Sequence, residues 1–131
     1  MDSFLYKNIT GFFFLTVGAI FDCISWWLIK SLFNKHGLID LTSPKDSFHY
    51  IIKLLHEPKM IIALTTFFAG PVFSFLALNR LKLIEVYPWV IFLHVFFIFV
   101  TGYFLLNEEV SYRQLFGVVI LVSGVFIFYS K

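Results

Sequence analysis

The feature that most constrains this chain is an acidic side chain near the middle of a long apolar run, residues 9–33 (ITGFFFLTVGAIFDCISWWLIKSLF). A helix of about 20 apolar residues crosses the roughly 30 Å hydrocarbon core of a bilayer, so this run is long enough to span a membrane. An ionised carboxylate at the centre of such a helix costs about 2.5–3.5 kcal/mol even on insertion scales. We therefore expect Asp22 to face a polar pathway or a partner helix rather than lipid.

Two further side chains extend this polar position into a stripe. Trp26 and Lys30 follow Asp22 at successive i, i+4 intervals, and this interval places side chains on one face of a helix. Asp22, Trp26 and Lys30 are therefore candidate substrate-binding or proton-binding residues.

The composition agrees with a membrane protein and excludes several other classes. Hydrophobic residues make up 60% of the chain and charged residues 14%, whereas charged residues are about 25% of a typical soluble domain. The net charge of +2 is too small to indicate nucleic-acid binding. The single cysteine, Cys23, excludes an intramolecular disulfide and belongs to no metal-binding motif. No catalytic motif or phosphate-binding loop is present, so we expect neither an enzyme nor a cofactor nor a metal.

The pattern predicts an all-α, single-domain bundle over residues 1–131. The expected membrane spans are residues 9–33, 60–79, 84–106 and 114–130, and residues 44–57 form a short amphipathic helix that begins after Ser43 as N-cap. That helix either lies flat on the membrane surface or packs on the other helices as a connector. The short connection at residues 79–83 predicts that the second and third spans are antiparallel neighbours.

Prolines and polar residues mark the two central spans. Gly70 and Pro71 are candidate kink positions, serving as a hinge or as a static bend, and Pro88 fits the first turn of the third span. We expect Tyr87 to face inward near one mouth of the bundle, with His94 two turns deeper. His94 either relays protons or, as we favour, joins two helices through a hydrogen bond.

The last span carries Gly117 and Gly124 two turns apart, and small residues let membrane helices approach closely. Ser111 is placed to cap this span, with Glu108 and Glu109 before its N-terminus, where the helix dipole favours acids. Four helices hardly enclose a pathway, so we expect a homodimer or a heterodimer with a paralogue, packed through the two glycines. Basic residues are divided almost evenly between the two sides, which leaves the orientation, and insertion in both orientations, open.

These features together resemble a known superfamily. The fragment NEEVSYRQLFGVVILVSGVFIF, the pair Asp22 and Lys30, and Tyr87 early in the third span are similar to the drug/metabolite transporter superfamily, in its four-helix small multidrug resistance branch. The pair Tyr87-Pro88 and the segment SPKDSFHYIIKLLHEP are closer to the EamA-like flippase subunits that move undecaprenyl-phosphate aminoarabinose across the inner membrane.

The resemblance implies roles for two residues and departs from the family at two points. By position Asp22 takes the place of the glutamate that binds protons or substrate, and Tyr87 that of the substrate-contacting tyrosine. The acid is one methylene shorter than the glutamate. Multidrug members carry small residues in the middle of the third helix, whereas this chain has Phe92-Leu93-His94, which argues against a polyspecific exporter.

Three functions remain open at this stage. The first is a flippase in the inner membrane that moves a polyprenyl-phosphate-linked sugar past Lys30, Asp22 and Tyr87 while the lipid tail stays in the bilayer. The second is an antiporter that exchanges protons at Asp22 for a hydrophobic cation. The third is a non-transporting assembly subunit whose Asp22 pairs with a helix of a larger partner.

Overall fold

The computed structural model describes residues 2–37 and 43–130, with side chains from residue 8 onward. Within these ranges all regular elements are helices, which confirms the all-α fold. They are α1 (Asp2–His36), α2 (Pro44–Leu55), α3 (Pro58–Leu78), α4 (Leu83–Leu105) and α5 (Tyr112–Tyr129). All but the short α2 are long and apolar enough to cross a membrane. The chain is therefore a multi-pass membrane protein, with α2 between its first two spans.

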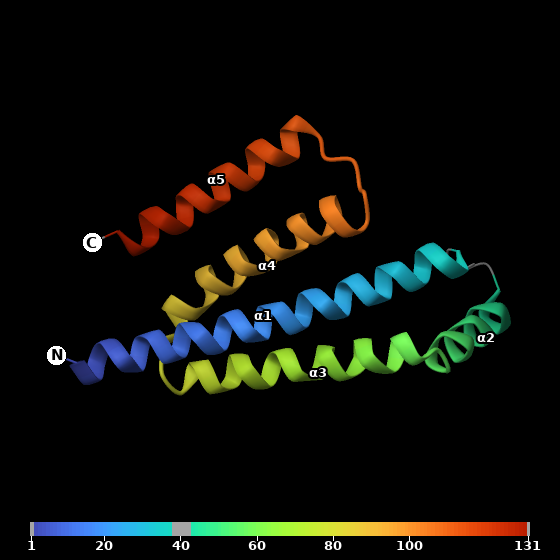
Figure 1. Cartoon of the computed structure of the whole chain (residues 1–131), viewed down its shortest axis with the longest axis horizontal. Helices are drawn as coiled ribbons and strands as arrows, with labels where there is room; N and C mark the ends of the chain where they lie inside the picture. Colours follow the sequence, from blue (N-terminus) through green and yellow to red (C-terminus); the bar gives the residue numbers. More distant parts are fainter. Residues whose placement is uncertain (1, 38–42, 131) are drawn as a thin grey trace.

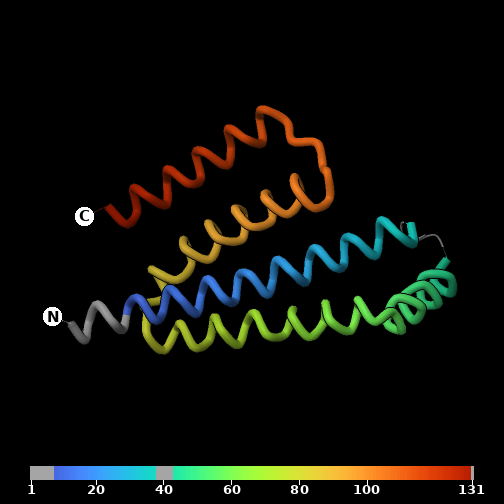
Figure 2. The backbone as a smooth tube through the Cα atoms, viewed as in Figure 1, coloured from blue at the N-terminus to red at the C-terminus, as the bar shows by residue number. Residues whose placement is uncertain are grey.

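The four spans lie side by side in the order α3, α1, α4, α5 (Figure 1). α1 packs along α3 over most of its length and against α4 on its other side. α5 lies outside α4 and contacts no other span extensively, so most of its surface is open. The tube in Figure 2 shows that the C-terminal end of α5 lies at the same end of the bundle as the N-terminal part of α1.

The second and third spans, α3 and α4, are antiparallel as predicted, but they are neighbours only near their turn. α1 lies between them along the rest of their length (Figure 1). A short connection determines the relative direction of two helices, but it leaves room for a third helix to enter once they diverge. The prediction of direct neighbours is thus correct only at the turn.

Small residues allow α1 and α3 to pack closely. A Cβ atom at Gly18 would lie 2.9 Å from the carbonyl oxygen of Gly70. Two turns further along α1, the fully buried hydroxyl of Ser25 donates a hydrogen bond of 2.9 Å to the carbonyl oxygen of Ala63. Close backbone approach of this kind is how membrane helices gain packing energy without a hydrophobic driving force. The backbones of α1 and α3 therefore approach closely, and the Ser25 side chain bonds one helix to the other.

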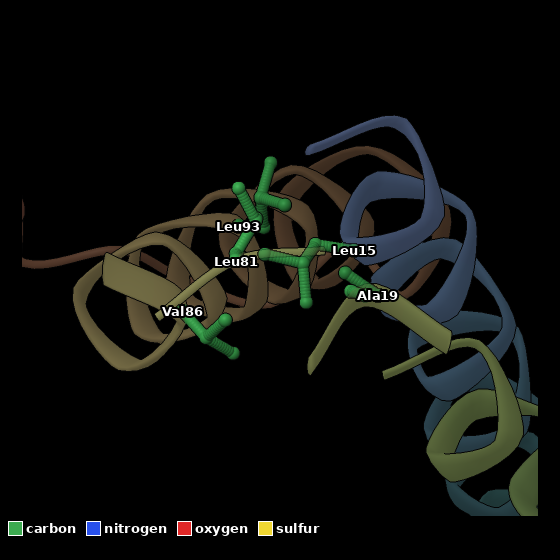
Figure 3. Close-up of a cluster of buried hydrophobic side chains, with 6 residues drawn as sticks. Leu15, Ala19, Leu81, Val86 and Leu93 are labelled. Atoms are coloured by element: carbon green, nitrogen blue, oxygen red, sulfur yellow. The ribbon is translucent and has the colours of Figure 1, made fainter. Parts of the chain in front are cut away.

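A buried hydrophobic cluster lies where α1 meets the turn between α3 and α4. Figure 3 shows side chains from α1, from the turn and from α4 gathered at this place. The cluster consists of Leu15, Ala19, Ala77, Leu81, Val86 and Leu93. Leu81 lies so close to α1 that a Cβ atom at Gly11 would fall 2.6 Å from it. This end of the bundle is therefore tightly packed.

Local sequence signals explain most helix ends. Gly37 stops α1 in the left-handed region with φ 83°, and Asn107 does the same after α4 with φ 52°. Ser111 caps α5 as predicted, and its hydroxyl accepts a hydrogen bond from the backbone N–H of Gln114. Ser43 occupies the N-cap position of α2 as predicted, although its side chain makes no capping hydrogen bond.

The two helix prolines behave differently from each other. α3 runs as one helix through Pro71. α4 begins at Leu83, so Pro88 lies beyond the first turn and not within it as predicted. The carbonyl of Ile84 therefore loses its helical hydrogen-bond donor. The first-turn placement was wrong, because Pro88 is the sixth residue of α4 and would be the fifth even from the expected start at residue 84.

The apolar face of α2 is largely open. Phe48, Ile51, Ile52 and Leu55 are exposed, and Leu54 is the one buried residue of this helix. A connector packed on the bundle would bury those four side chains, so the arrangement favours the alternative in which α2 lies on the membrane surface.

Candidate functional site

Asp22 is paired with His94 at the middle of two candidate membrane spans. The distance from Asp22 Oδ2 to His94 Nε2 is 3.0 Å, and their side chains are 17% and 27% exposed. Asp22 is the midpoint of the span Asn8–His36. The bond joins α1 to α4, so the acid that the sequence singled out finds its partner within the same chain.

The second ring nitrogen of His94, Nδ1, determines how many protons the Asp22–His94 pair holds. His94 Nδ1 lies 2.8 Å from the carbonyl oxygen of Val90. A carbonyl oxygen only accepts, so Nδ1 must carry a proton. A neutral histidine then presents a lone pair at Nε2, which accepts a hydrogen bond from protonated Asp22; a charged histidine instead donates to the carboxylate. In both states one proton lies between Asp22 and His94, and the pair has no net charge.

Gly70 of α3 provides the space for this pair. A Cβ atom at position 70 would lie 2.0 Å from Asp22 Oδ1, and Asp22 Cγ would be 2.6 Å away. The carboxyl group therefore rests against the backbone of α3. The neighbouring Pro71 lacks an N–H, which leaves the carbonyl of Phe67 without its usual helical donor. The pair thus lies where three spans meet.

A second polar contact joins α1 to α4 beside the first. The hydroxyl of Thr101 donates to the carbonyl oxygen of Phe97 at 2.7 Å. The Sγ atom of Cys23 lies 2.9 Å from the same hydroxyl oxygen, and the Thr101 proton is already used, so the thiol donates. Cys23 is buried and acts here as a structural hydrogen-bond donor.

A third contact, the ion pair of Lys30 and Glu108, lies nearer the membrane surface. The distance from Lys30 Nζ to Glu108 Oε1 is 3.7 Å, and the two side chains are 51% and 50% exposed. The backbone N–H of Glu108 donates to the carbonyl oxygen of Gly102 at 3.0 Å. A Cβ atom at Gly102 would lie 3.1 Å from Glu108 Oε2. The loop after α4 therefore folds back and holds its carboxylate over the helix end.

Two cavities flank Glu108. The larger, of about 490 Å³, lies between α4 and α5 and extends from His94 to Glu109. The smaller, of about 250 Å³, lies between α1 and α4. Its lining includes Cys23, Trp26, Trp27, Lys30, Thr101 and Leu106. Both cavities are lined by Ile98, Gly102 and Glu108, so these residues form the boundary between them.

The predicted polar stripe on α1 is divided between two places. Asp22 meets His94, whereas Trp26 and Lys30 line the smaller cavity. Trp26 is half exposed and makes an edge contact with Phe67 of α3, with ring centroids 6.5 Å apart. The three side chains therefore follow one side of α1 but do not converge on one point.

Tyr87 does not face the interior as predicted. Its side chain is 64% exposed and lines a shallow groove with Pro88 and Gly124 of α5. α4 presents Val86 to the core, and the next residue along a helix is turned by about 100°. Tyr87 is therefore directed away from α1 and is separated from Asp22 in this structure.

The glycines of α5 present an open face. A Cβ built on Gly117 or Gly124 would have no described atom within 4 Å beyond its own stretch of helix. Gly117 lines the larger cavity and Gly124 the shallow groove beside Tyr87. Their use in dimer packing stays a prediction.

One further charged cluster lies at the membrane surface where α1 ends. Glu57, the N-cap residue of α3, accepts hydrogen bonds from Lys35 at 3.0 Å and His36 at 2.9 Å. These bonds, that of Lys35 first, lower the pKa of Glu57 below its ordinary value of 4.5. The cluster connects the ends of α1 and α3. Among the described residues no group of three metal-ligating side chains occurs.

Several of these residues could not be singled out from the sequence. Cys23, Thr101 and Gly102 carry no signal that separates them from ordinary residues of a span. Glu108 was expected to favour the N-terminus of the last helix, but it turns toward Lys30 instead. A polar residue in each of two spans is the one signal that pointed to Asp22 and His94.

Comparisons with models of protein families, with curated proteins and with solved structures find no match to this chain. The resemblance to the transporter superfamily is therefore carried by the sequence fragments alone. Four long apolar helices identify the chain as a small four-span membrane protein.

Proposed function

We propose that the protein is a small transporter of the inner membrane in which the Asp22–His94 pair releases and regains one proton as an amphipathic substrate crosses. The observation that carries the proposal is the pair itself, an acid and an imidazole 3.0 Å apart at the midpoint of a span. Ionisable residues at this depth are costly and usually mark a proton or substrate pathway.

The geometry supports exchange of a single proton. Nδ1 of His94 is held by the Val90 carbonyl, so its proton remains in place. The proton between Nε2 and Asp22 Oδ2 is the one that can leave. Its loss gives the pair a charge of −1 in a poorly hydrated setting, which is unfavourable unless water or a substrate reaches it. Proton release is thereby linked to opening of the site.

The first substrate class is a lipid-linked sugar, such as a polyprenyl-phosphate sugar. Lys30 supports it, because a lysine at the mouth of a cavity between two spans attracts a phosphate while the lipid tail stays in the bilayer. In this case the protein is a flippase, as the resemblance implies.

The second class is a hydrophobic cation. Glu108 and Glu109 line the larger cavity, and His94 lies at its other end. A cation that enters between these acids displaces the shared proton, which is antiport. A dimer, with itself or with a paralogue, supplies the remaining wall of the pathway in either case.

The test uses proteoliposomes of the purified chain. Addition of a fluorescent polyprenyl-phosphate sugar or of ethidium should cause substrate movement together with proton movement, followed by an internal pH dye. Asp22→Asn should abolish the proton signal, and His49→Gln, on the surface helix, should keep it. Equal proton movement in Asp22→Asn and the unchanged chain would exclude this role for the pair.

The third function, an assembly subunit, gives a different result. It required Asp22 to pair with a helix of a larger partner, whereas Asp22 is paired with His94 of its own chain. If neither substrate moves and the protein is recovered only with a larger membrane enzyme, the assembly function is correct.

A further inference from the structure

We propose that Lys30 is a binding site for the anionic headgroup of a membrane amphiphile, and that Glu108 occupies this site when no ligand is present. The inference deepens the proposed function, because it names the chemistry of the ligand that the smaller cavity takes. It concerns binding alone and does not depend on proton exchange at Asp22.

The position of Lys30 in the lining of the smaller cavity points to an anion there. Among the described residues that line the two cavities beside Glu108, Lys30 is the one lysine or arginine. Its partner is a carboxylate that the chain itself supplies from the loop after α4. A site that accepts a tethered carboxylate also accepts a carboxylate or phosphate monoester from a ligand, because both present oxygen acceptors to an ammonium group.

The contact between Lys30 and Glu108 is one that a ligand can replace. Its length of 3.7 Å exceeds that of a hydrogen bond, and both side chains are about half exposed. Pairs of this kind contribute little stability. The ammonium group therefore keeps donors free for a second anion.

The surroundings suit the apolar part of an amphiphile. Trp26 and Trp27 line the smaller cavity beside Lys30. Ile98 and Gly102 separate it from the larger cavity, whose lining includes the apolar Phe99, Val118 and Leu121 besides the polar His94, Glu109 and Gln114. When Glu108 leaves Lys30, the boundary between the cavities loses its one charged member. A headgroup on Lys30 then has a continuous apolar path for its tail along α4.

The binding test uses dodecyl phosphate and the purified chain in phosphatidylcholine nanodiscs. Binding is read from tryptophan emission, since two of the three tryptophans line the cavity, and from adducts in native mass spectrometry. Lys30→Gln should weaken binding about tenfold or more, because a charge-assisted contact is lost. Glu108→Gln should tighten it about two- to fivefold, because the competing carboxylate is removed.

Two variants separate this site from general attraction and from misfolding. Lys35→Gln removes a lysine that is bound to Glu57 and lines neither cavity, so binding should stay unchanged. Lys30→Arg keeps the charge and should keep binding. Equal affinity of Lys30→Gln and the unchanged chain, or weaker binding in Glu108→Gln, would overturn the proposal.

A parallel titration with inorganic phosphate identifies the source of the anion. Binding of dodecyl phosphate alone assigns the site to a lipid-type ligand, and binding of both shows that the headgroup suffices; saturation by neither refutes the site. Asp22→Asn should still bind dodecyl phosphate. Failure of proton coupling and failure of this site are therefore distinguished by separate measurements.

Discussion

The carboxyl group of Asp22 rests on the backbone of Gly70, so closely that a Cβ atom at position 70 would fall 2.0 Å from Asp22 Oδ1. The sequence suggested that Gly70 belonged to a kink with Pro71. The structure gives it a second use, since no other residue leaves room for the acid between α1 and α3.

Gly70→Ala should therefore displace Asp22 from His94 and destabilise the chain. Overpacking of a close contact costs about 1–3 kcal/mol. The loss is measured as a change in the free energy of unfolding, in a detergent that keeps the protein monomeric. Gly124→Ala is the matched control, because nothing lies within 4 Å of a Cβ there. Equal stability of the two variants would show that Asp22 does not lie against α3.

The Nδ1 atom of His94 should carry a proton, because the Val90 carbonyl accepts from it. Nitrogen NMR of ¹⁵N-histidine-labelled protein in nanodiscs measures the protonation of each ring nitrogen. Of the two ring nitrogens of His94, we expect only Nε2 to change its ¹⁵N chemical shift in the Asp22→Asn variant. His56 is the control, since its Nδ1 also lies 2.8 Å from a carbonyl, that of Ile52. A His94 that carries its proton on Nε2 alone would contradict the shared-proton geometry.

Glu57 should make stability depend on pH at the acidic end. Hydrogen bonds from Lys35 and His36 lower its pKa in the folded chain below the ordinary 4.5. A carboxyl group with a lowered folded pKa stabilises the fold above its unfolded pKa, and this contribution is lost as the pH falls through the folded value. The unchanged chain should thus melt at a higher temperature than Glu57→Gln at pH 7, and the two curves should converge in acid. A constant difference at all pH values would exclude this assignment.

The open face of α2 should contact lipid. Spin labels attached to Phe48→Cys and Lys45→Cys, each in a Cys23→Ser background, measure contact with oxygen dissolved in the bilayer against a water-soluble relaxant. Phe48 belongs to the exposed apolar face of α2, so its label should respond mainly to oxygen. The label at Lys45 should respond mainly to the relaxant. Equal responses at the two positions would place α2 in water.

The membrane spans could be predicted from the sequence because a bilayer requires long apolar helices, and hydropathy reports these directly. Asp22 and His94 were recognisable for the same reason, as exceptions to that requirement. Their pairing was not, because it depends on how α1 and α4 are aligned along their axes, and no sequence pattern encodes that alignment.

Tyr87 and Glu108 show the same limit. The sequence placed Tyr87 in a span, but the inward direction expected for it was wrong, because Val86 faces the core instead. Glu108 was recognised as an acid before a helix, yet the left-handed Asn107 reverses the chain and carries the carboxylate back over Gly102. Both outcomes depend on single backbone angles or rotations that are set by tertiary packing.

The contacts that hold α4 to the bundle differ from those that hold α1 to α3. α1 lies close to the backbone of α3 and bonds to it through Ser25, whereas two side-chain contacts, Asp22 with His94 and Cys23 with Thr101, hold α4 to α1. The cluster of Leu15, Leu81 and Val86 closes the end beside the turn. That cluster is the point about which α4 would pivot. A tilt of α4 about that cluster would move the far end of α4 more than its middle, so it would separate Lys30 from Glu108 farther than Asp22 from His94.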